Sequence, residues 1–204
     1  MKKTTMAVAV AVLGLMANEA MAQQQSPWLV RARVVNIAPD NAVDSNVAGT
    51  GKDLTVSSKT IPEVDISYFF SPNIAAELIL TYPQKHDVAL GGGNIGSFKH
   101  LPPTLLAQYH FLPAGTLDPY LGVGLNYTRI SSVNLQAVNG TLENHSFGVA
   151  LQAGLDYKID QNWSLNLDVK KIRIRSDLTV LGGVNGGTVK VDPLLVGVGV
   201  GYRF

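Results

Sequence analysis

The C-terminal segment LLVGVGVGYRF, from Leu194 to Phe204, alternates strictly between two kinds of side chain. A period of two predicts a β-strand, because successive side chains of a strand point to opposite faces. One face carries Leu194, Val196, Val198, Val200, Tyr202 and Phe204. The other face carries mostly glycine, together with Leu195 and Arg203. An apolar face that ends in aromatic residues is typical of a strand between lipid and a lumen, and the alternative is an edge strand of a soluble sandwich.

The N-terminus has the features of a secretory signal. A charged Lys2-Lys3 pair precedes the apolar run Met6–Met16, and Ala20-Met21-Ala22 forms a small-x-small cleavage pattern. We interpret residues 1–22 as a removed signal peptide and residues 23–204 as one mature domain. A membrane-spanning helix needs roughly 20 apolar residues, and charge, glycine or proline interrupts every other apolar stretch. If the mature chain crosses a membrane, it must therefore form a closed barrel.

Eight segments of the chain alternate in the same way. They are Trp28–Val35, Glu63–Phe70, Ala75–Tyr82, Thr104–Phe111, Tyr120–Thr128, Ser146–Tyr157, Trp163–Lys170 and Leu194–Phe204. The apolar face of each segment lacks charged residues, as a lipid-facing surface requires, because Arg or Lys near the bilayer midplane costs about 2–4 kcal/mol. Short turns alternate with longer links between the segments. This pattern predicts an all-β, eight-stranded antiparallel transmembrane β-barrel with short periplasmic turns and four longer extracellular loops.

Aromatic residues fall at both ends of the predicted strands. Those expected at the periplasmic rim are Trp28, Phe70, Phe111, Tyr157, Trp163 and Phe204, and those expected at the outer rim are Tyr82, Tyr127 and Phe147. Two such belts are typical of membrane–water interfaces.

Composition and motifs argue against several other functions. The net charge of +1 and the lack of a basic cluster exclude nucleic acid as an expected partner. His86 and His100 flank one loop, but no cysteine or tight carboxylate cluster accompanies them, so we predict no metal site. Ser131, Ser132 and His145 bracket another loop without a visible orienting acid. We therefore expect neither an enzyme nor a cofactor.

Five stretches of the mature chain resemble one protein family. They are SPNIAAELI (Ser71–Ile79), KHLPPTLLAQYHF (Lys99–Phe111), PYLGVGLNYT (Pro119–Thr128), QAGLDYKIDQNWSLNLDVKKI (Gln152–Ile172) and VDPLLVGVGVGYRF (Val191–Phe204). In order and spacing they resemble the OmpW family of outer-membrane proteins. The resemblance implies an eight-stranded barrel with a hydrophobic interior that passes small apolar molecules, and family members also serve as phage or bacteriocin receptors. The loops Asp40–Thr60 and Gly91–Gly96 match no motif.

Charged residues fall on the predicted inner face, mostly toward the periplasmic end. They are Arg31, Arg33, Asp65, Glu77, Asp156, Asp168, Lys170 and Arg203. Because buried charges must be paired, we expect a mutually neutralised network that blocks the lower lumen. The alternative is that the network only holds the barrel closed, and the two roles are compatible.

Apolar residues occupy the inner face nearer the outer end. They are Val35, Ile79, Leu106, Ile172 and Leu195, accompanied by Gly122, Gly124 and Gly148, which are expected to leave room. An eight-stranded barrel is just wide enough for its own side chains or one small ligand. We predict a hydrophobic lumen open to the exterior; inert packing of the barrel is the alternative.

Prolines mark the outer ends of the third and fourth segments. Pro83, Pro102 and Pro103 lack the backbone N–H that a strand ladder needs. We expect a weak lateral seam here, through which apolar cargo leaves the lumen sideways. The alternative is that the prolines only end strands that continue into a loop.

These features favour an outer-membrane channel for passive uptake of small hydrophobic molecules. The alternative is a structural or receptor barrel with a closed lumen. Expected partners are small hydrophobic solutes, outer-membrane lipid and lipopolysaccharide. Its phosphates are expected to meet Lys171, Arg173 and Arg175, and the alternative is that these residues form only a solvated loop base. The C-terminal strand, through Tyr202 and Phe204, is expected to carry the signal for the barrel-assembly machinery.

Overall fold

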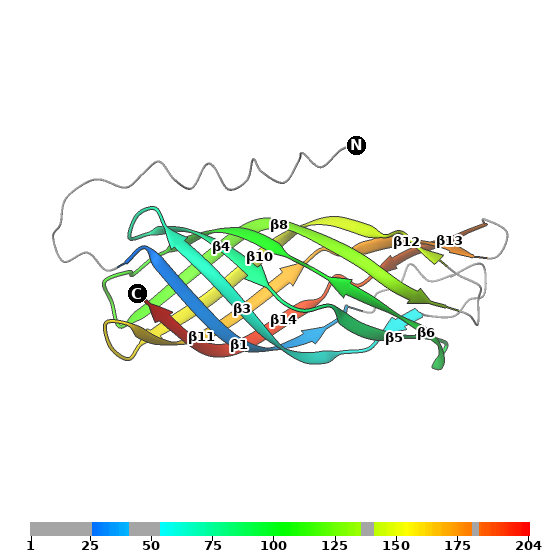
Figure 1. Cartoon of the computed structure of the whole chain (residues 1–204), viewed down its shortest axis with the longest axis horizontal. Coiled ribbons are helices and arrows are strands. Elements are labelled where there is room, and N and C mark those ends of the chain that lie inside the picture. Colours follow the sequence, from blue (N-terminus) through cyan, green and yellow to red (C-terminus); the bar gives the residue numbers. More distant parts are fainter. Residues whose placement is uncertain (1–25, 41–53, 136–140, 181–183) are drawn as a thin grey trace, which may run out of the picture.

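The computed structural model describes residues 26–40, 54–135, 141–180 and 184–204, and every regular element in these ranges is a β-strand (Figure 1). The strands are β1 (Trp28–Ala38), β2 (Leu54–Val56), β3 (Lys59–Phe69), β4 (Ile74–Leu80), β5 (Gln84–Leu90), β6 (Gly93–Leu101), β7 (Thr104–His110), β8 (Leu117–Asn134), β9 (Thr141–Leu142), β10 (His145–Lys158), β11 (Trp163–Ile172), β12 (Arg175–Val180), β13 (Val184–Lys190) and β14 (Leu194–Arg203). Within the described ranges, no helix has the length and hydropathy needed to cross a membrane. The predicted signal peptide, 1–22, lies outside the described residues.

Eight of these strands form a closed antiparallel barrel. Their order around the barrel is β1, β3, β4, β7, β8, β10, β11 and β14, and β14 pairs back with β1. At this junction Val34 lies opposite Val198. Each of the eight predicted segments coincides with one barrel strand within a few residues, except that β8 and β1 continue further. The predicted fold is therefore confirmed.

The short connections lie at the same end of the barrel as the first residues of β1 and the C-terminus (Figure 1). We call this end the turn end and the opposite end the link end. In one turn, between β10 and β11, the carboxylate of Asp160 accepts backbone N–H groups from Asn162 at 2.8 Å and Trp163 at 2.7 Å. These two hydrogen bonds hold the pKa of Asp160 below its ordinary value.

The longer links contain strands, which corrects the expectation of plain loops. The hairpin β5–β6 pairs with the outer half of the 18-residue strand β8, where His100 lies opposite Ile130. Strand β2 adds to β5, and β9, β12 and β13 form a second small sheet. The barrel wall is thereby extended at the link end (Figure 1).

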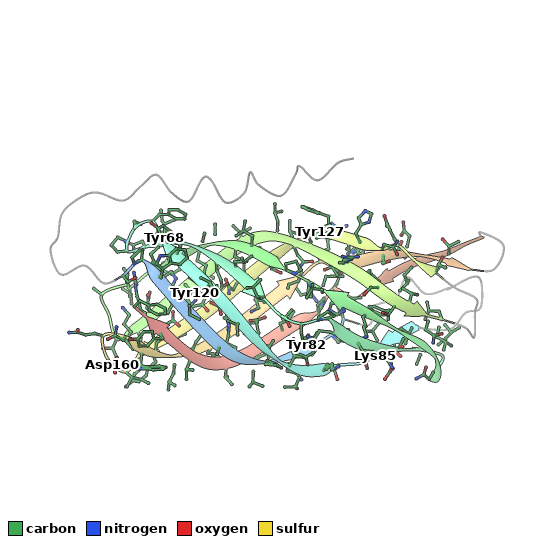
Figure 2. The ribbon with its side chains drawn as sticks, viewed as in Figure 1. Tyr68, Tyr82, Lys85, Tyr120, Tyr127 and Asp160 are labelled. Carbon is green, nitrogen blue, oxygen red and sulfur yellow. The ribbon has the colours of Figure 1, made fainter. Side chains whose placement is uncertain are left out.

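The outer surface of the barrel is apolar and exposed. Outward-facing residues such as Val198 and Leu121 are 57% and 53% exposed, while their neighbours on the inner face are largely buried. All the aromatic residues predicted for the two belts are exposed. At the turn end the rings also contact one another, with Tyr202 4.9 Å from Trp163 and 5.1 Å from Phe204 between ring centroids. Tyr68 lies near the turn end, and Tyr82 and Tyr127 lie further toward the link end (Figure 2).

Some inner-face glycines allow neighbouring strands to approach closely, which leads to a first prediction. A Cβ atom at Gly124 would overlap the backbone carbonyl of Leu105 on β7. At Gly197 the nearest atom would be the Val35 Cγ2 at 3.0 Å, part of a side chain that can move. We expect Gly124→Ala to lower the free energy of unfolding by about 1–3 kcal/mol, as overpacking does, and Gly197→Ala to cost less. Urea titration in lipid vesicles measures both, and equal costs would contradict the close-approach explanation.

Candidate functional site

A buried arginine on β1 organises the lower lumen. The guanidinium of Arg31 donates to both carboxylate oxygens of Asp156, at 2.6 and 3.2 Å. It also donates to Asp65 at 3.3 Å and to the Ser67 hydroxyl at 3.1 Å. Its carbon Cζ lies 5.2 Å from the ring centroid of Tyr120. Arg31 is fully buried, so these contacts replace the water that a charged side chain otherwise needs.

Arg33 extends this network one step toward the link end, because it lies two residues further along the same strand face. It forms ion pairs with Glu77 at 2.7 Å, Asp168 at 3.0 Å and Glu63 at 3.2 Å, and it also contacts Asp65. Lys170 joins from β11, with Nζ 2.6 Å from Glu63 and 3.0 Å from Asp168.

Neutral polar side chains complete the layer. The Gln152 amide donates to Glu77 at 2.8 Å and to Asp168 at 2.7 Å. The Tyr120 hydroxyl donates to Asp168 at 2.8 Å, and Asn166 donates to Asp156 at 2.8 Å. Tyr120 lies within the barrel toward the turn end (Figure 2). We call this layer the polar plug; its members are Arg31, Arg33, Glu63, Asp65, Ser67, Glu77, Tyr120, Gln152, Asp156, Asn166, Asp168 and Lys170.

The composition of the polar plug differs from the prediction in two residues. Arg203 does not join it: its guanidinium lies 4.0 Å from the ring centroid of Phe69 and donates to the Ser26 carbonyl at 2.9 Å. Among the described residues Arg203 forms no ion pair. Glu63 joins instead, and its place on the same strand face as Asp65 was a usable signal. A mutually neutralised network was expected, but three cations face five carboxylates. The cations are Arg31, Arg33 and Lys170, and the carboxylates are Glu63, Asp65, Glu77, Asp156 and Asp168.

Above the polar plug the inner face carries a hydrophobic cluster, with buried polar side chains such as Thr104 and Asn126 beside it. The five apolar residues predicted there are all buried and belong to one hydrophobic cluster: Val35, Ile79, Leu106, Ile172 and Leu195. The cluster continues toward the link end through residues that lie in the predicted loops: Ile37, Val56, Ile61, Val88, Phe98, Ile130, Leu135, Leu142, Ile174 and Val191. We call this cluster the upper lumen. The sequence did not show that the buried apolar cluster continues beyond the predicted outer rim, because the strands of the links were predicted to be loops.

The glycines expected to leave room in the lumen do not do so. The space beside Gly122 is taken by the Gln152 side chain, and the backbone of β7 approaches Gly124. At Gly148 the backbone of Arg173 occupies the corresponding space. The physical reason is that a residue without Cβ lets a neighbouring strand or a long side chain move in, because interiors are close-packed.

The three prolines lie where strand pairing is interrupted. The ladder between β4 and β7 ends at Ile79 opposite Thr104, and pairing resumes only between β5 and β6, with Gln84 opposite His100. Pro83, Pro102 and Pro103 fall between these two ladders. Pro103 is still hydrogen-bonded to β8, because its carbonyl accepts the backbone N–H of Tyr127 at 3.1 Å.

A second ladder ends at the same height. Pairing between β3 and β4 ends at Val64 opposite Leu80, although β3 continues to Lys59 and remains paired with β1. Instead of pairing, the Tyr82 carbonyl accepts the side-chain amide of Gln84 at 2.6 Å. Among the described residues, both ladders of β4 therefore stop before Thr81–Pro83.

Comparison with known proteins agrees with this architecture. The model of the OmpW family matches residues 24–204. An uncharacterised outer-membrane protein of Sinorhizobium fredii, y4mB, is 44% identical over 92% of this chain and 84% of its own. The crystal structure of the outer-membrane protein OprG from Pseudomonas aeruginosa superposes with a TM-score of 0.75 at 26% identity, over 89% of this chain and 97% of that one. PahQ of Pseudomonas aeruginosa, named as a protein of a dibenzothiophene metabolism operon, is 25% identical over 89% of this chain and 90% of its own.

A closed eight-stranded barrel, an apolar outer surface between two aromatic belts and a family match over residues 24–204 all agree. The turn end is accordingly the periplasmic end, and the link end faces the cell exterior. This chain belongs to the OmpW family and is an outer-membrane β-barrel protein.

Proposed function

We propose that this barrel admits small hydrophobic molecules passively from the cell exterior into the outer membrane. The observation that carries the proposal is the division of one lumen into two parts. The upper lumen is lined by apolar side chains such as Val35, Ile79 and Leu106, whereas the polar plug below it consists of buried ions and amides. Transfer of an apolar solute from water to the upper lumen is favourable. Transfer to the polar plug offers no comparable stabilisation.

The polar plug supports closure along the barrel axis. Its charged side chains, such as Arg31 and Asp156, are at most 6% exposed. To pass, a solute would have to separate ion pairs that are cut off from water, and each unpaired ion carries a desolvation penalty of several kcal/mol. An apolar cargo therefore needs another way out.

The interrupted ladders support a lateral exit. Thr81–Pro83 and Pro102–Pro103 lie just above the apolar part of the wall, near the outer aromatic belt marked by Tyr82 and Tyr127. Opening the wall at this point breaks fewer backbone hydrogen bonds than opening it elsewhere, and each such bond contributes about 0.5–1.5 kcal/mol. The dibenzothiophene in the operon name of PahQ is an apolar aromatic compound, which agrees with the proposed solute class.

Restoring backbone donors at the prolines tests the exit. In the double variant Pro102→Val, Pro103→Val we expect the uptake rate of an apolar fluorescent tracer into proteoliposomes to fall about tenfold, because up to two added hydrogen bonds stabilise the closed wall. Pro113→Val, at the turn end, is the matched control and should leave the rate unchanged. Equal rates in the double variant and the wild type would reject the lateral exit.

The alternative function, a structural or receptor barrel with a closed lumen, predicts a different result for the wild-type protein. A barrel whose lumen is closed at both ends should give tracer uptake no faster than empty liposomes. Uptake above that background, without ion current through a planar bilayer, is what the proposed channel requires.

The remaining partners and processing steps are also proposals. A surface cavity of about 550 Å³ is lined by the apolar Phe147 and Val149, by Arg173 and Arg175, and by the carboxylates Glu143 and Asp177. Arg175 also forms an ion pair with Asp192 at 2.9 Å, so we propose Arg173 as the phosphate contact for a lipopolysaccharide whose acyl chain lies against Phe147 and Val149. Tyr202 is half-buried near the end of the strand that closes the barrel, and Phe204, which follows this strand, is exposed; the assembly machinery would bind here. We infer that residues 1–22 are removed and that 23–204 form the functional domain.

A further inference from the structure

Three neighbouring polar side chains lie buried beside the apolar residues of the upper lumen. They are Gln84 and His86 on β5 and His100 on β6, with exposed fractions of 0%, 0% and 2%. Gln84 lies opposite His100 in the strand register. The two imidazole rings stack with their centroids 4.8 Å apart and their planes 15° apart. Phe98 extends this group, its ring centroid 6.1 Å from that of each histidine.

One atom of each of the three side chains has no hydrogen-bond partner among the described residues. These atoms are Gln84 Oε1, His86 Nε2 and His100 Nδ1. A buried polar atom without a partner costs about 1–3 kcal/mol, and such atoms are few in folded proteins. Three of them on one patch of the lumen wall indicate a site that a ligand completes.

The neighbouring contacts define what two of these atoms offer. The amide nitrogen of Gln84 donates to the Tyr82 carbonyl at 2.6 Å and to the Thr81 hydroxyl at 3.0 Å, which leaves Oε1 as a free acceptor. His86 Nδ1 lies 2.7 Å from the Ser57 carbonyl, which only accepts, so Nδ1 carries the proton. His86 Nε2 is then an acceptor as well. The site therefore presents at least two acceptors without a donor.

The charges around the site favour a neutral ligand. Burial lowers the pKa of His100 to about 3, and burial also lowers that of His86. Lys59 acts on both rings in the same direction, whereas Asp87 opposes it at His86. Both rings are therefore uncharged near pH 7 and do not attract an anion. A metal cation is not indicated either, because the described residues contain no group of three or more His, Cys, Asp or Glu side chains that could hold one, and Lys59 adds positive charge.

We propose that Gln84, His86 and His100 bind the hydroxyl group of a small, otherwise apolar solute, an alcohol or a phenol, as it passes through the upper lumen. This inference rests on the proposed uptake function. The solute's O–H donates to Gln84 Oε1 or His86 Nε2, and its apolar body packs against the surrounding cluster that includes Val88 and Phe98. The flat histidine and phenylalanine rings suit an aromatic body, since offset stacking stabilises ring pairs.

A matched pair of probes tests the site in the wild-type protein. 4-Methylphenol and p-xylene differ by a hydroxyl in place of a methyl group. With the mature chain in lipid nanodiscs, we expect 4-methylphenol to bind about fivefold to tenfold more tightly at equal membrane concentration, the ratio that one hydrogen bond of about 1 kcal/mol or slightly more provides. Nitrogen NMR signals of His86 and His100 should shift with the phenol and not with p-xylene.

Variants locate the effect. His86→Phe and His100→Phe should each reduce the phenol preference to within about twofold, whereas His145→Phe, at an exposed histidine, should retain it. Equal binding of the two probes by the wild type would overturn the site, and this result needs no variant to fold. Larger histidine shifts with micromolar Zn²⁺ than with the phenol would overturn it in favour of a metal site. If the wild type binds both probes equally and p-xylene still enters liposomes, only this inference is rejected, whereas absence of p-xylene uptake by the wild type would reject the proposed function.

Discussion

Replacing Arg31 with methionine is expected to lower the free energy of unfolding by about 3–5 kcal/mol, the cost of breaking a buried ion pair by removing one partner. Arg31 contacts Asp156, Asp65 and Glu77, all buried. Carboxylates already outnumber cations in the polar plug, so the loss of one cation leaves negative charges close together without compensation. Methionine keeps the volume of the side chain, which separates the loss of charge from the formation of a cavity.

Urea unfolding in lipid vesicles, followed by tryptophan fluorescence, measures this effect. The matched control is Arg203→Met, which removes the same side chain from the same inner face but outside the polar plug. Arg203 has one hydrogen bond to Ser26 and a contact with the Phe69 ring, so its loss should cost about 1 kcal/mol. Equal costs for the two variants would show that the ion network contributes no special stability.

A charge placed on the lipid-facing surface should be nearly as damaging. Val198 lies near the middle of β14, opposite Val34 on one side and Leu167 on the other, and it is 57% exposed. An arginine at the bilayer midplane costs about 2–4 kcal/mol because its guanidinium loses water. We therefore expect Val198→Arg to lower the free energy of unfolding by that amount.

Depth in the membrane provides the control. Leu117 is also apolar and about equally exposed, but it is the first residue of β8 and lies at the turn end opposite Tyr157. Near the interface an arginine costs about 0–1 kcal/mol, because it reaches water. Similar losses for Leu117→Arg and Val198→Arg, in the same vesicle titration, would contradict the assigned membrane position.

The barrel strands were predictable because lipid imposes a strict rule on one face. In Ser146–Tyr157, for example, every outward position is apolar, and β10 extends only one residue beyond this segment at each end. No soluble surface excludes charge so completely, so the pattern identifies both the strands and their outer faces. The order of short turns and long links then gives eight strands and their orientation.

The strands of the links were missed because their outward side chains lie beyond the lipid, where charged residues are allowed. In β5, QKHDVAL, the outward side chains include Lys85 and Asp87, and the buried side chains are Gln84, His86 and Val88. Both faces are mixed, so the sequence offers no contrast between an apolar and a polar side. The paired strands, the continuation of the upper lumen and the site at Gln84 all depend on hydrogen bonding between β5, β6 and β8.

The sequence by itself determined which side chains face lipid and which face the lumen, because alternation along a strand is a local property of the backbone. Only the tertiary structure decided which inward residues meet. Strands in a barrel are tilted and staggered, so the height of a residue depends on the register of every strand around the ring. That stagger brings Glu63 to Arg33 and Lys170, leaves Arg203 beside Phe69, and aligns the three prolines at one break in the wall.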